Sequence, residues 1–211
     1  MASDAGGSRP VMQLLASGLQ LWIRQRCQSI ESLDIALQGS ALGLLRGRLE
    51  GVQLLARRAV YQHLPIEQVE LVSESISVQM GNLLKGQPLV LEQPFAIAGQ
   101  LSFSAAGLTA LFSHPQWQGL ADQLQDQLLG RVPLAEVRIS TDGLVFVLQG
   151  NGSADRVELQ VQTRAADGTI ELCSDAGERL FRFAMDPNIT IERVWIEAGM
   201  VQLIGRARVS P

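Results

Sequence analysis

Residues 89–103, LVLEQPFAIAGQLSF, carry the clearest β-strand pattern in the sequence, and the predicted fold is built around them. Its large apolar side chains all occupy odd positions: Leu89, Leu91, Phe95, Ile97, Leu101 and Phe103. From residue 92 to residue 102 the even positions carry small or polar residues, among them Glu92 and Gln100. Such alternation is typical of a β-strand with one apolar face and one face open to water. Because this run is far longer than the usual strand of about 5–6 residues, and Pro94 and Gly99 interrupt it, we expect a bent, strongly curved strand.

The residues before this stretch also alternate. A short apolar alternation at 33–37 is followed by two predicted strands, 48–60 and 66–80, which the turn at His63-Leu64-Pro65 separates. From Pro133 onward, short apolar alternations are separated by turn dipeptides such as Asp167-Gly168. This spacing predicts a meander of antiparallel hairpins.

Two segments have helical periodicity, one before the first predicted strand and one directly after residue 103. Residues 10–30 place one apolar face on Leu15, Leu19, Trp22, Ile23, Cys27 and Ile30. Pro10 fits the first turn of that helix. A second helix is expected from Ser104, as the N-cap, to Leu129, with a kink at Pro115 and Gly130 at its end. Its apolar positions are Leu108, Leu111, Phe112, Trp117, Leu120, Leu124 and Leu128.

Together these patterns predict the α+β class. We expect a curved, mainly antiparallel sheet wrapped on two amphipathic helices, with a flexible N-terminus at residues 1–10 and a single domain at 11–211. In this arrangement Phe95, Ile97, Leu101 and Phe103 lie opposite Leu120 and Leu124, because these are the two strong apolar faces nearest to each other in sequence.

Composition narrows the class of function. The 211 residues carry a formal charge of −4, which argues against a nucleic-acid-binding protein. Cys27 and Cys173 are the only cysteines, which favours two free thiols over a disulfide framework or a zinc site. The apolar run from Val11 to Ile23 is interrupted by glutamines and is too short for a membrane span. We therefore expect a cytoplasmic protein, with or without membrane association, that has no signal peptide or transmembrane segment.

Catalytic patterns are weak. There is no G-x-S-x-G motif, and Ser113-His114 are neighbours in sequence only. His63 and His114 lie far apart in sequence without an HExxH or HxxxH motif, so we expect each at a loop or helix end and predict no metal. Gly150-Asn151-Gly152-Ser153 lacks the lysine of a phosphate loop and is interpreted as a hairpin turn. We predict a protein that is not an enzyme and has no cofactor.

The apolar pattern itself leaves two interpretations open. Helices that cover one face of a sheet form a dry core, whereas a strongly curved sheet around a helix leaves a groove for acyl chains. The closest arginine pairs are Arg24/Arg26, Arg46/Arg48 and Arg57/Arg58, which suit either contact with lipid headgroup phosphates or a role as scattered solubilising charge. The predicted contacts with a headgroup or an anionic membrane are Arg46, Arg48, Arg57, Arg58 and the single lysine, Lys85.

A resemblance to a known family favours the groove. The run ALGLLRG at 41–47, continuing to Val60, the strand at 66–80, LLKG at 83–86 and the segment 95–111 resemble the LmeA-like phospholipid-binding family of bacterial proteins. The resemblance covers roughly residues 15–205. It implies a fold similar to tubular lipid-binding domains, in which a curved antiparallel sheet wraps a long helix. It also implies binding of phospholipid acyl chains and a role in membrane-lipid maintenance.

The sequence therefore predicts non-enzymatic binding of a phospholipid or fatty acid in an apolar groove. The predicted lining residues come from the long strand and the second helix: Phe95, Ile97, Leu101, Phe103, Leu108, Leu111, Phe112, Trp117, Leu120 and Leu124. The alternative is a structural or partner-binding module that binds no ligand and forms a homodimer through its apolar face.

Overall fold

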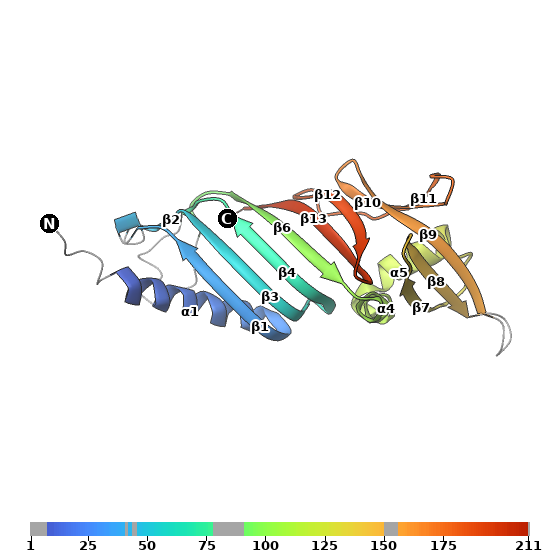
Figure 1. The fold of residues 1–211 in the computed structure, drawn as a ribbon, viewed down its shortest axis with the longest axis horizontal. Helices are drawn as coiled ribbons and strands as arrows, with labels where there is room; N and C mark the ends of the chain where they lie inside the picture. The colour runs from blue at the N-terminus through green and yellow to red at the C-terminus, as the bar shows by residue number, and fades with distance from the viewer. Residues whose placement is uncertain (1–7, 41, 44–45, 78–90, 150–155, 211) are drawn as a thin grey trace.

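Two antiparallel sheets lie one after the other along the long axis of the molecule (Figure 1). The computed structural model describes residues 8–40, 42–43, 46–77, 91–149 and 156–210. The six-stranded sheet has the order β1 (Cys27–Gln38), β3 (Gly51–Tyr61), β4 (Leu64–Ser73), β6 (Phe95–Phe103), β13 (Met200–Val209) and β12 (Ile189–Glu197). The five-stranded sheet has the order β11 (Arg179–Arg182), β10 (Thr169–Cys173), β9 (Arg156–Ala166), β8 (Leu144–Gln149) and β7 (Leu134–Ile139).

The described residues thus confirm the α+β class and the antiparallel pairing of the strands. A small third sheet pairs β2 (Arg48–Leu49) with β5 (Ile76–Ser77). The helices whose bounds lie within the described residues are α1 (Ser8–Arg26), α4 (Ala105–Ser113) and α5 (Gln118–Gln127), with the 3-10 turn η1 (Pro115–Trp117) between the last two. The expectation of one curved sheet was therefore incomplete, because the hairpins after Pro133 divide between two larger sheets.

The stretch that dominated the sequence pattern supplies a central strand. β6 pairs with β4 on one side and with β13, the last strand of the chain, on the other. The strand begins at Phe95, after Pro94, so it is shorter than the alternation predicted; residues 89 and 90 lie outside the described part. Gly99 pairs with Gly205, and a Cβ atom on Gly99 would lie 2.3 Å from Cδ2 of Leu71. A larger residue there would require the Leu71 side chain to shift, because its end occupies the space above the strand.

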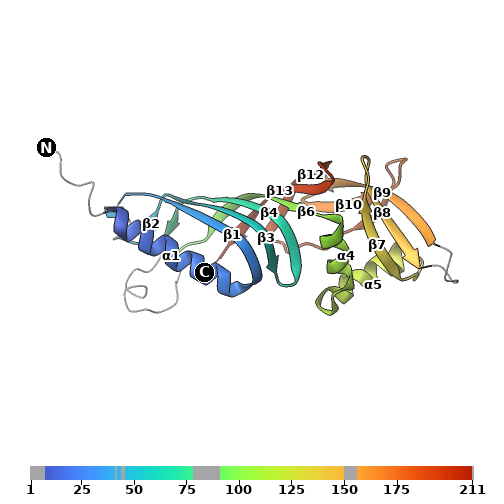
Figure 2. The ribbon, with the colours of Figure 1, turned by 60° about the horizontal axis from the view of Figure 1, so that its bottom comes forward.

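Helix α1 lies along the six-stranded sheet, next to β1 (Figure 2). Pro10 is in its first turn as expected, and Ser8–Pro10 belong to the helix although a flexible segment 1–10 was predicted; residues 1–7 lie outside the described part. The helix ends at Arg26, not at residue 30, because Cys27 begins β1 directly. Gln20 donates a hydrogen bond from Nε2 to the carbonyl of Leu33 at 3.3 Å, which joins the helix to the strand.

The predicted second helix is two helices. Ser104 caps α4 by accepting a hydrogen bond from the Gly107 amide at 3.2 Å, as expected. Pro115 ends the first helix and starts η1, so the predicted kink is a complete break. Gly130 follows α5 with φ of 61°, and the amide of Arg131 donates to the carbonyl of Gln125 at 3.0 Å. These features form the expected glycine C-terminal motif.

The helices after β6 attach to the five-stranded sheet. The hydroxyl of Thr109 on α4 accepts a hydrogen bond from the Val137 amide of β7 at 2.9 Å. Leu124 of α5 is 1% exposed and belongs to the same hydrophobic core as Phe146, Leu172 and Phe181, which are at most 2% exposed. The same core continues onto the six-stranded sheet, where it includes Phe103, Val201 and Leu203, and α4 and α5 lie where the two sheets meet (Figure 2). No helix in the described residues is long and apolar enough to cross a membrane.

Candidate functional site

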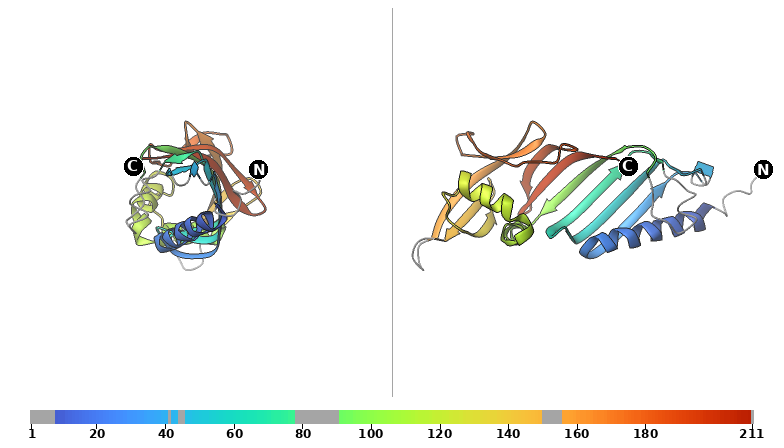
Figure 3. Two further views of the ribbon diagram at one scale, coloured as in Figure 1. Left: turned by 90° about the vertical axis from the view of Figure 1, so that its left-hand side faces the viewer. Right: turned by 180° about the vertical axis from the view of Figure 1, so that it is seen from behind.

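The six-stranded sheet has one apolar face, and cross-strand pairing arranges it in rows. The first row contains Leu33, Ala56, Val69, Leu101, Leu203 and Val194. The second contains Ile35, Leu54, Leu71, Gly99, Gly205 and Ile191. The third runs from Leu37 through Val52 and Ser73, ending with Ile97, Ala207 and Ile189. Seen end-on, the sheet curls around the side on which α1 lies (Figure 3).

The burial of this face falls from one end of the strands to the other. Beside α4, Phe103 and Val201 are each 6% exposed, and Leu203 in the first row is 9% exposed. In the second row Leu54 and Leu71 are half-buried against the core and Ile191 is 8% exposed, and in the third row Ile97 is half-buried while Ile189 is 38% exposed. The apolar face is therefore a closed core next to α4 and a partly open surface away from it.

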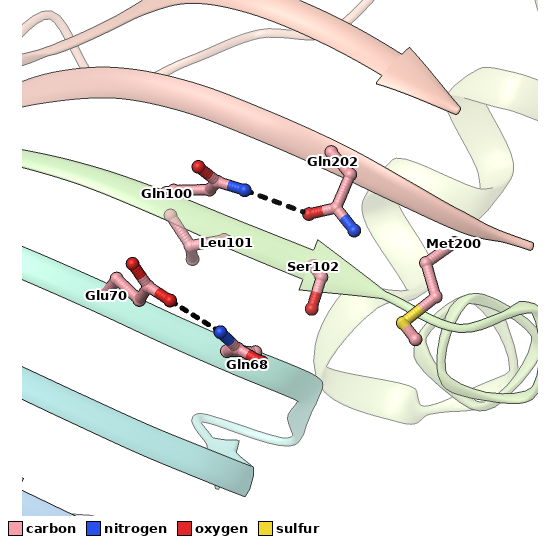
Figure 4. A pocket seen from close by; sticks show the side chains of 7 residues that line it. All are labelled: Gln68, Glu70, Gln100, Leu101, Ser102, Met200 and Gln202. Carbon is pink, nitrogen blue, oxygen red and sulfur yellow. Dashed lines mark hydrogen bonds between the residues drawn. The ribbon is translucent and has the colours of Figure 1, made fainter. Parts of the chain in front are cut away.

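The opposite face of the same sheet is polar. Glu70 and Gln100 pair across β4 and β6, and Gln202 on β13 accepts a hydrogen bond from Gln100 at 3.5 Å. A hollow of about 110 Å³ lies among these side chains, where Gln68 donates to Glu70 at 2.6 Å (Figure 4). A second hollow of about 260 Å³ lies beside Arg206 and Arg208. Both are smaller than the roughly 300–1,000 Å³ of typical ligand sites and both have linings that mix polar and apolar side chains, so neither suits an acyl chain.

The predicted lining residues of β6 divide along the strand. Ile97 and Leu101 are half-buried on the apolar face. Phe95 is half-buried at the start of β6, opposite Val209, and Phe103 is buried at its other end. The structure thus places Ile97 at the open part of the face and Phe103 in the closed core.

The predicted lining residues of the second helix gather at the junction between the sheets. Leu111 is 7% exposed, and Phe112 contacts Phe146 of β8 edge-to-face at 6.3 Å between ring centroids. The others, all partly or fully buried against the same core, are Leu108, Leu120 and Leu124. Trp117 donates from its indole nitrogen to the Gln62 carbonyl at 3.0 Å. Contact of these helical residues with lipid stays a prediction.

The predicted headgroup arginines do not form one patch. Arg46 and Arg48 lie before β3, whereas Arg57 and Arg58 lie near its other end, about 20 Å away along an extended strand. Arg58 has a φ of 45° and forms an ion pair with Glu31 of β1. Lys85 lies outside the described residues.

The two histidines are brought together, which the sequence did not indicate. The rings of His63 and His114 stack at 4.0 Å between centroids, linking the β3–β4 turn to the corner between α4 and η1. His114 accepts the Gln116 amide at Nδ1, and Ser113 donates its hydroxyl to the Thr109 carbonyl at 2.8 Å. Ser113 and His114 therefore bond to the backbone and not to each other. Within the described ranges, no three His, Cys, Asp or Glu side chains form a group that suits a metal ion.

A charged cluster on the five-stranded sheet was also missed. The Glu171 side chain is 3% exposed and forms ion pairs with Arg164, Arg179 and Arg182 at 2.8, 3.5 and 3.3 Å. The hydrogen bond from Arg164, with the positive charge of the neighbouring arginines, lowers the pKa of Glu171. Only the register of β9, β10 and β11 brings these residues together, so no local sequence pattern marks the cluster.

Comparison with known proteins identifies a family for the chain. A family model described as LmeA-like phospholipid-binding matches residues 6–206. No curated protein and no solved structure shows a significant match. Because the matched region covers nearly the whole chain, the protein belongs to the LmeA-like phospholipid-binding family.

Proposed function

We propose that the protein binds phospholipid by holding acyl chains against the apolar face of the six-stranded sheet, on the side where α1 lies. The observation that carries this proposal is the partly open second and third rows of that face, where Leu54, Leu71 and Ile97 are only half-buried. An aliphatic surface without aromatic rings suits a flexible chain better than a flat ring system. The chain's membership in a phospholipid-binding family supports the same ligand class.

The six-stranded sheet is wide enough to hold an acyl chain, and burial of the chain supplies enough free energy for binding. Six strands at about 4.8 Å spacing give a face about 24 Å wide, enough for an extended acyl chain to lie across it. Each buried methylene contributes about 0.8 kcal/mol, so a dozen contribute roughly 10 kcal/mol before the costs of ordering lipid and protein. A long-chain phospholipid or fatty acid is therefore the ligand class that fits best.

The proposed site differs in extent from the predicted lining set. Ile97 and Leu101 form its centre, with Leu54 and Leu71 added from the neighbouring strands. Leu124 lies too deep in a packed core to contact a ligand without rearrangement of α5. The role is binding or carrying lipid in membrane maintenance without catalysis, within a domain comprising residues 11–211.

We further propose that arginine side chains contact the headgroup of the bound phospholipid. Arg46 and Arg48 are one candidate group, and Arg57 with Arg58 is the other; Lys85, outside the described residues, stays a candidate from the sequence alone. Replacement of both arginines of a group by glutamine should weaken retention of anionic phospholipid more than retention of neutral phospholipid. Equal retention of both classes by both double variants would remove the arginines from the site.

The lipid site is tested with two matched substitutions on opposite faces of the sheet. Ile97 and Val72 are β-branched residues on neighbouring strands, where Val72 pairs with Ala98 and is 51% exposed on the polar face. Ile97→Asn places an amide among acyl methylenes, at a cost of about 1–3 kcal/mol, which lowers lipid retention at least fivefold. Val72→Asn should retain lipid as the parent does.

The readout is lipid identification after organic extraction, together with native mass spectrometry of the purified proteins. Bound phospholipid in the parent and in Val72→Asn, but not in Ile97→Asn, supports the proposal. Equal retention in both variants would place the lipid elsewhere. A lipid-free homodimer of the parent would favour the alternative of a partner-binding module.

A further inference from the structure

We propose that the C-terminal half of α1 docks the protein onto an anionic lipid bilayer, with Leu21 and Trp22 in the membrane interface and Arg24 and Arg26 at the phosphates. This surface, the α1 docking face, consists of α1 residues alone and does not include the arginine pairs near β3. The docking proposal rests on the proposed function in one respect. Docking through α1 would place the bilayer where lipid enters or leaves the acyl-binding face.

The first observation is that α1 has apolar residues on two sides. Ile23 packs against the hydrophobic core, and Leu19 is also half-buried, so this side of the helix is covered by the sheet. Leu21 and Trp22 are 59% and 50% exposed. The sequence pattern had assigned Trp22 to the core side, and the structure corrects this. Adjacent exposed leucine and tryptophan side chains on a helix are typical of helices that lie in a membrane interface.

The second observation is the sign of the charge around this face. α1 contains no Asp or Glu, and its last turn contains Arg24 and Arg26, in a chain whose formal charge is −4. The nearest strand carries two acidic residues, which are directed elsewhere. Asp34 is exposed and adjoins Leu33 in the alternation of β1, on the face opposite to α1, and Glu31 forms an ion pair with Arg58. The basic end of α1 is therefore complementary to an anionic surface.

The third observation is the geometry of Trp22 and Arg26. The guanidinium carbon of Arg26 lies 5.1 Å from the centroid of the Trp22 ring. In this arrangement the indole can enter the apolar boundary of a bilayer while the charge stays at the headgroup level, where both side chains are most favourable. Arg24 donates from Nη1 to the carbonyl of Ile30 at 3.2 Å, which holds its charge beside the same end of the helix.

The position of α1 connects docking with lipid binding. The helix runs beside β1, the strand at the edge of the six-stranded sheet, and on the same side as the apolar face (Figure 3). A bilayer in contact with the α1 docking face would thus lie beside the acyl-binding surface. An acyl chain could pass between them without crossing the polar face of the sheet.

The chain provides a matched control. Trp195 on β12 also lies under an arginine, because the guanidinium carbon of Arg193 is 4.8 Å from its ring centroid. Trp195 differs in its charge environment, since its indole nitrogen donates to the carboxylate of Glu197 at 3.1 Å. Trp195 is also half-buried, whereas Trp22 is 50% exposed. Docking at α1 therefore predicts a loss of binding for Trp22→Ala alone, whereas non-specific adsorption through tryptophan rings predicts a loss for both variants.

The experiment is flotation of the purified full chain with phosphatidylcholine vesicles, with and without phosphatidylglycerol, at low salt. The parent should float with the anionic vesicles and lose this binding as salt is added. Trp22→Ala should reduce recovery several-fold, and replacement of Arg24 or Arg26 by Gln should reduce the partition coefficient about fivefold for each arginine removed. Trp195→Ala should float as the parent does.

Three flotation results would contradict docking through α1. No flotation of the parent on anionic vesicles, or equal recovery of Trp22→Ala and the parent, would overturn docking through α1. Equal losses in Trp22→Ala and Trp195→Ala would also overturn it. Thermal melting of each variant shows whether it is folded, and extraction of bound lipid separates the two proposals. A variant that no longer docks but still retains lipid supports docking as a separate step, whereas a lipid-free parent that still floats would remove only the acyl site.

Discussion

Substitution by tryptophan at two positions distinguishes the packed core from the open face. Leu124 is 1% exposed in the core that contains Phe146, which is fully buried. A larger ring at Leu124 has no free space, and overpacking of this kind costs about 1–3 kcal/mol. For a chain of this size each kcal/mol lowers Tm by about 2–4 °C, so Leu124→Trp should lower Tm by about 2–12 °C. Ile97→Trp lies on the partly open face and should lower Tm by less than about 2 °C.

The assay is calorimetric melting of lipid-stripped protein, followed by measurement of the lipid retained by each unstripped variant. Ile97→Trp fills the space of the ligand, so it should melt near the parent temperature and lose most of its lipid. Leu124→Trp should melt early and keep its lipid at temperatures where it is folded. The opposite pattern, with an unchanged Tm and lost lipid in Leu124→Trp, would refute this reasoning. It would place the lipid against α5, as the sequence pattern alone had suggested.

Two further predictions concern residues outside the apolar face. Glu171 has a folded-state pKa below its ordinary value of 4.5, so its ion pairs stabilise the protein fully above pH 4.5 and lose this effect as pH falls through the folded-state pKa. The stability difference between the parent and Glu171→Gln, measured by urea unfolding, should be largest near neutral pH and shrink on acidification; a difference that does not change with pH would contradict this. Thr109→Val removes the acceptor for the buried Val137 amide and should lower the free energy of unfolding by about 1–3 kcal/mol, so an unchanged urea midpoint would show that the bond is dispensable.

Local sequence signals predicted the elements with the clearest physical cause. The alternation from Phe95 to Phe103 indicated a strand because side chains on a strand point to opposite faces, and β6 covers these residues. Ser104 and Gly130 marked helix boundaries because a hydroxyl can accept the free amides of a helix and glycine adopts positive φ. Pro115 marked the interruption, although its full effect depended on the 3-10 turn that follows.

The arrangement of the elements depended on contacts that local patterns do not contain. Trp22 fits an apolar helical spacing, yet which side of α1 meets β1 is decided by tertiary packing, and Trp22 remains half exposed. Leu124 and Ile97 have similar hydrophobicity, but one lies in a packed core and the other on a partly open face. Their difference arises from the second sheet, which the sequence indicated only as a series of hairpins. The stacking of His63 on His114 likewise depends on a contact between distant turns.

The most direct test of the lipid site is photocrosslinking with a phospholipid that carries a diazirine in its acyl chain. The labelled peptides of the purified full chain are then identified by mass spectrometry. We predict labels on β3, β4 and β6 at Leu54, Leu71 and Ile97, with loss of labelling when unlabelled phospholipid is added in excess. Labels confined to the core around Phe146, labels on the polar face at Val72, or no competable label would contradict an acyl site on the apolar face of the six-stranded sheet.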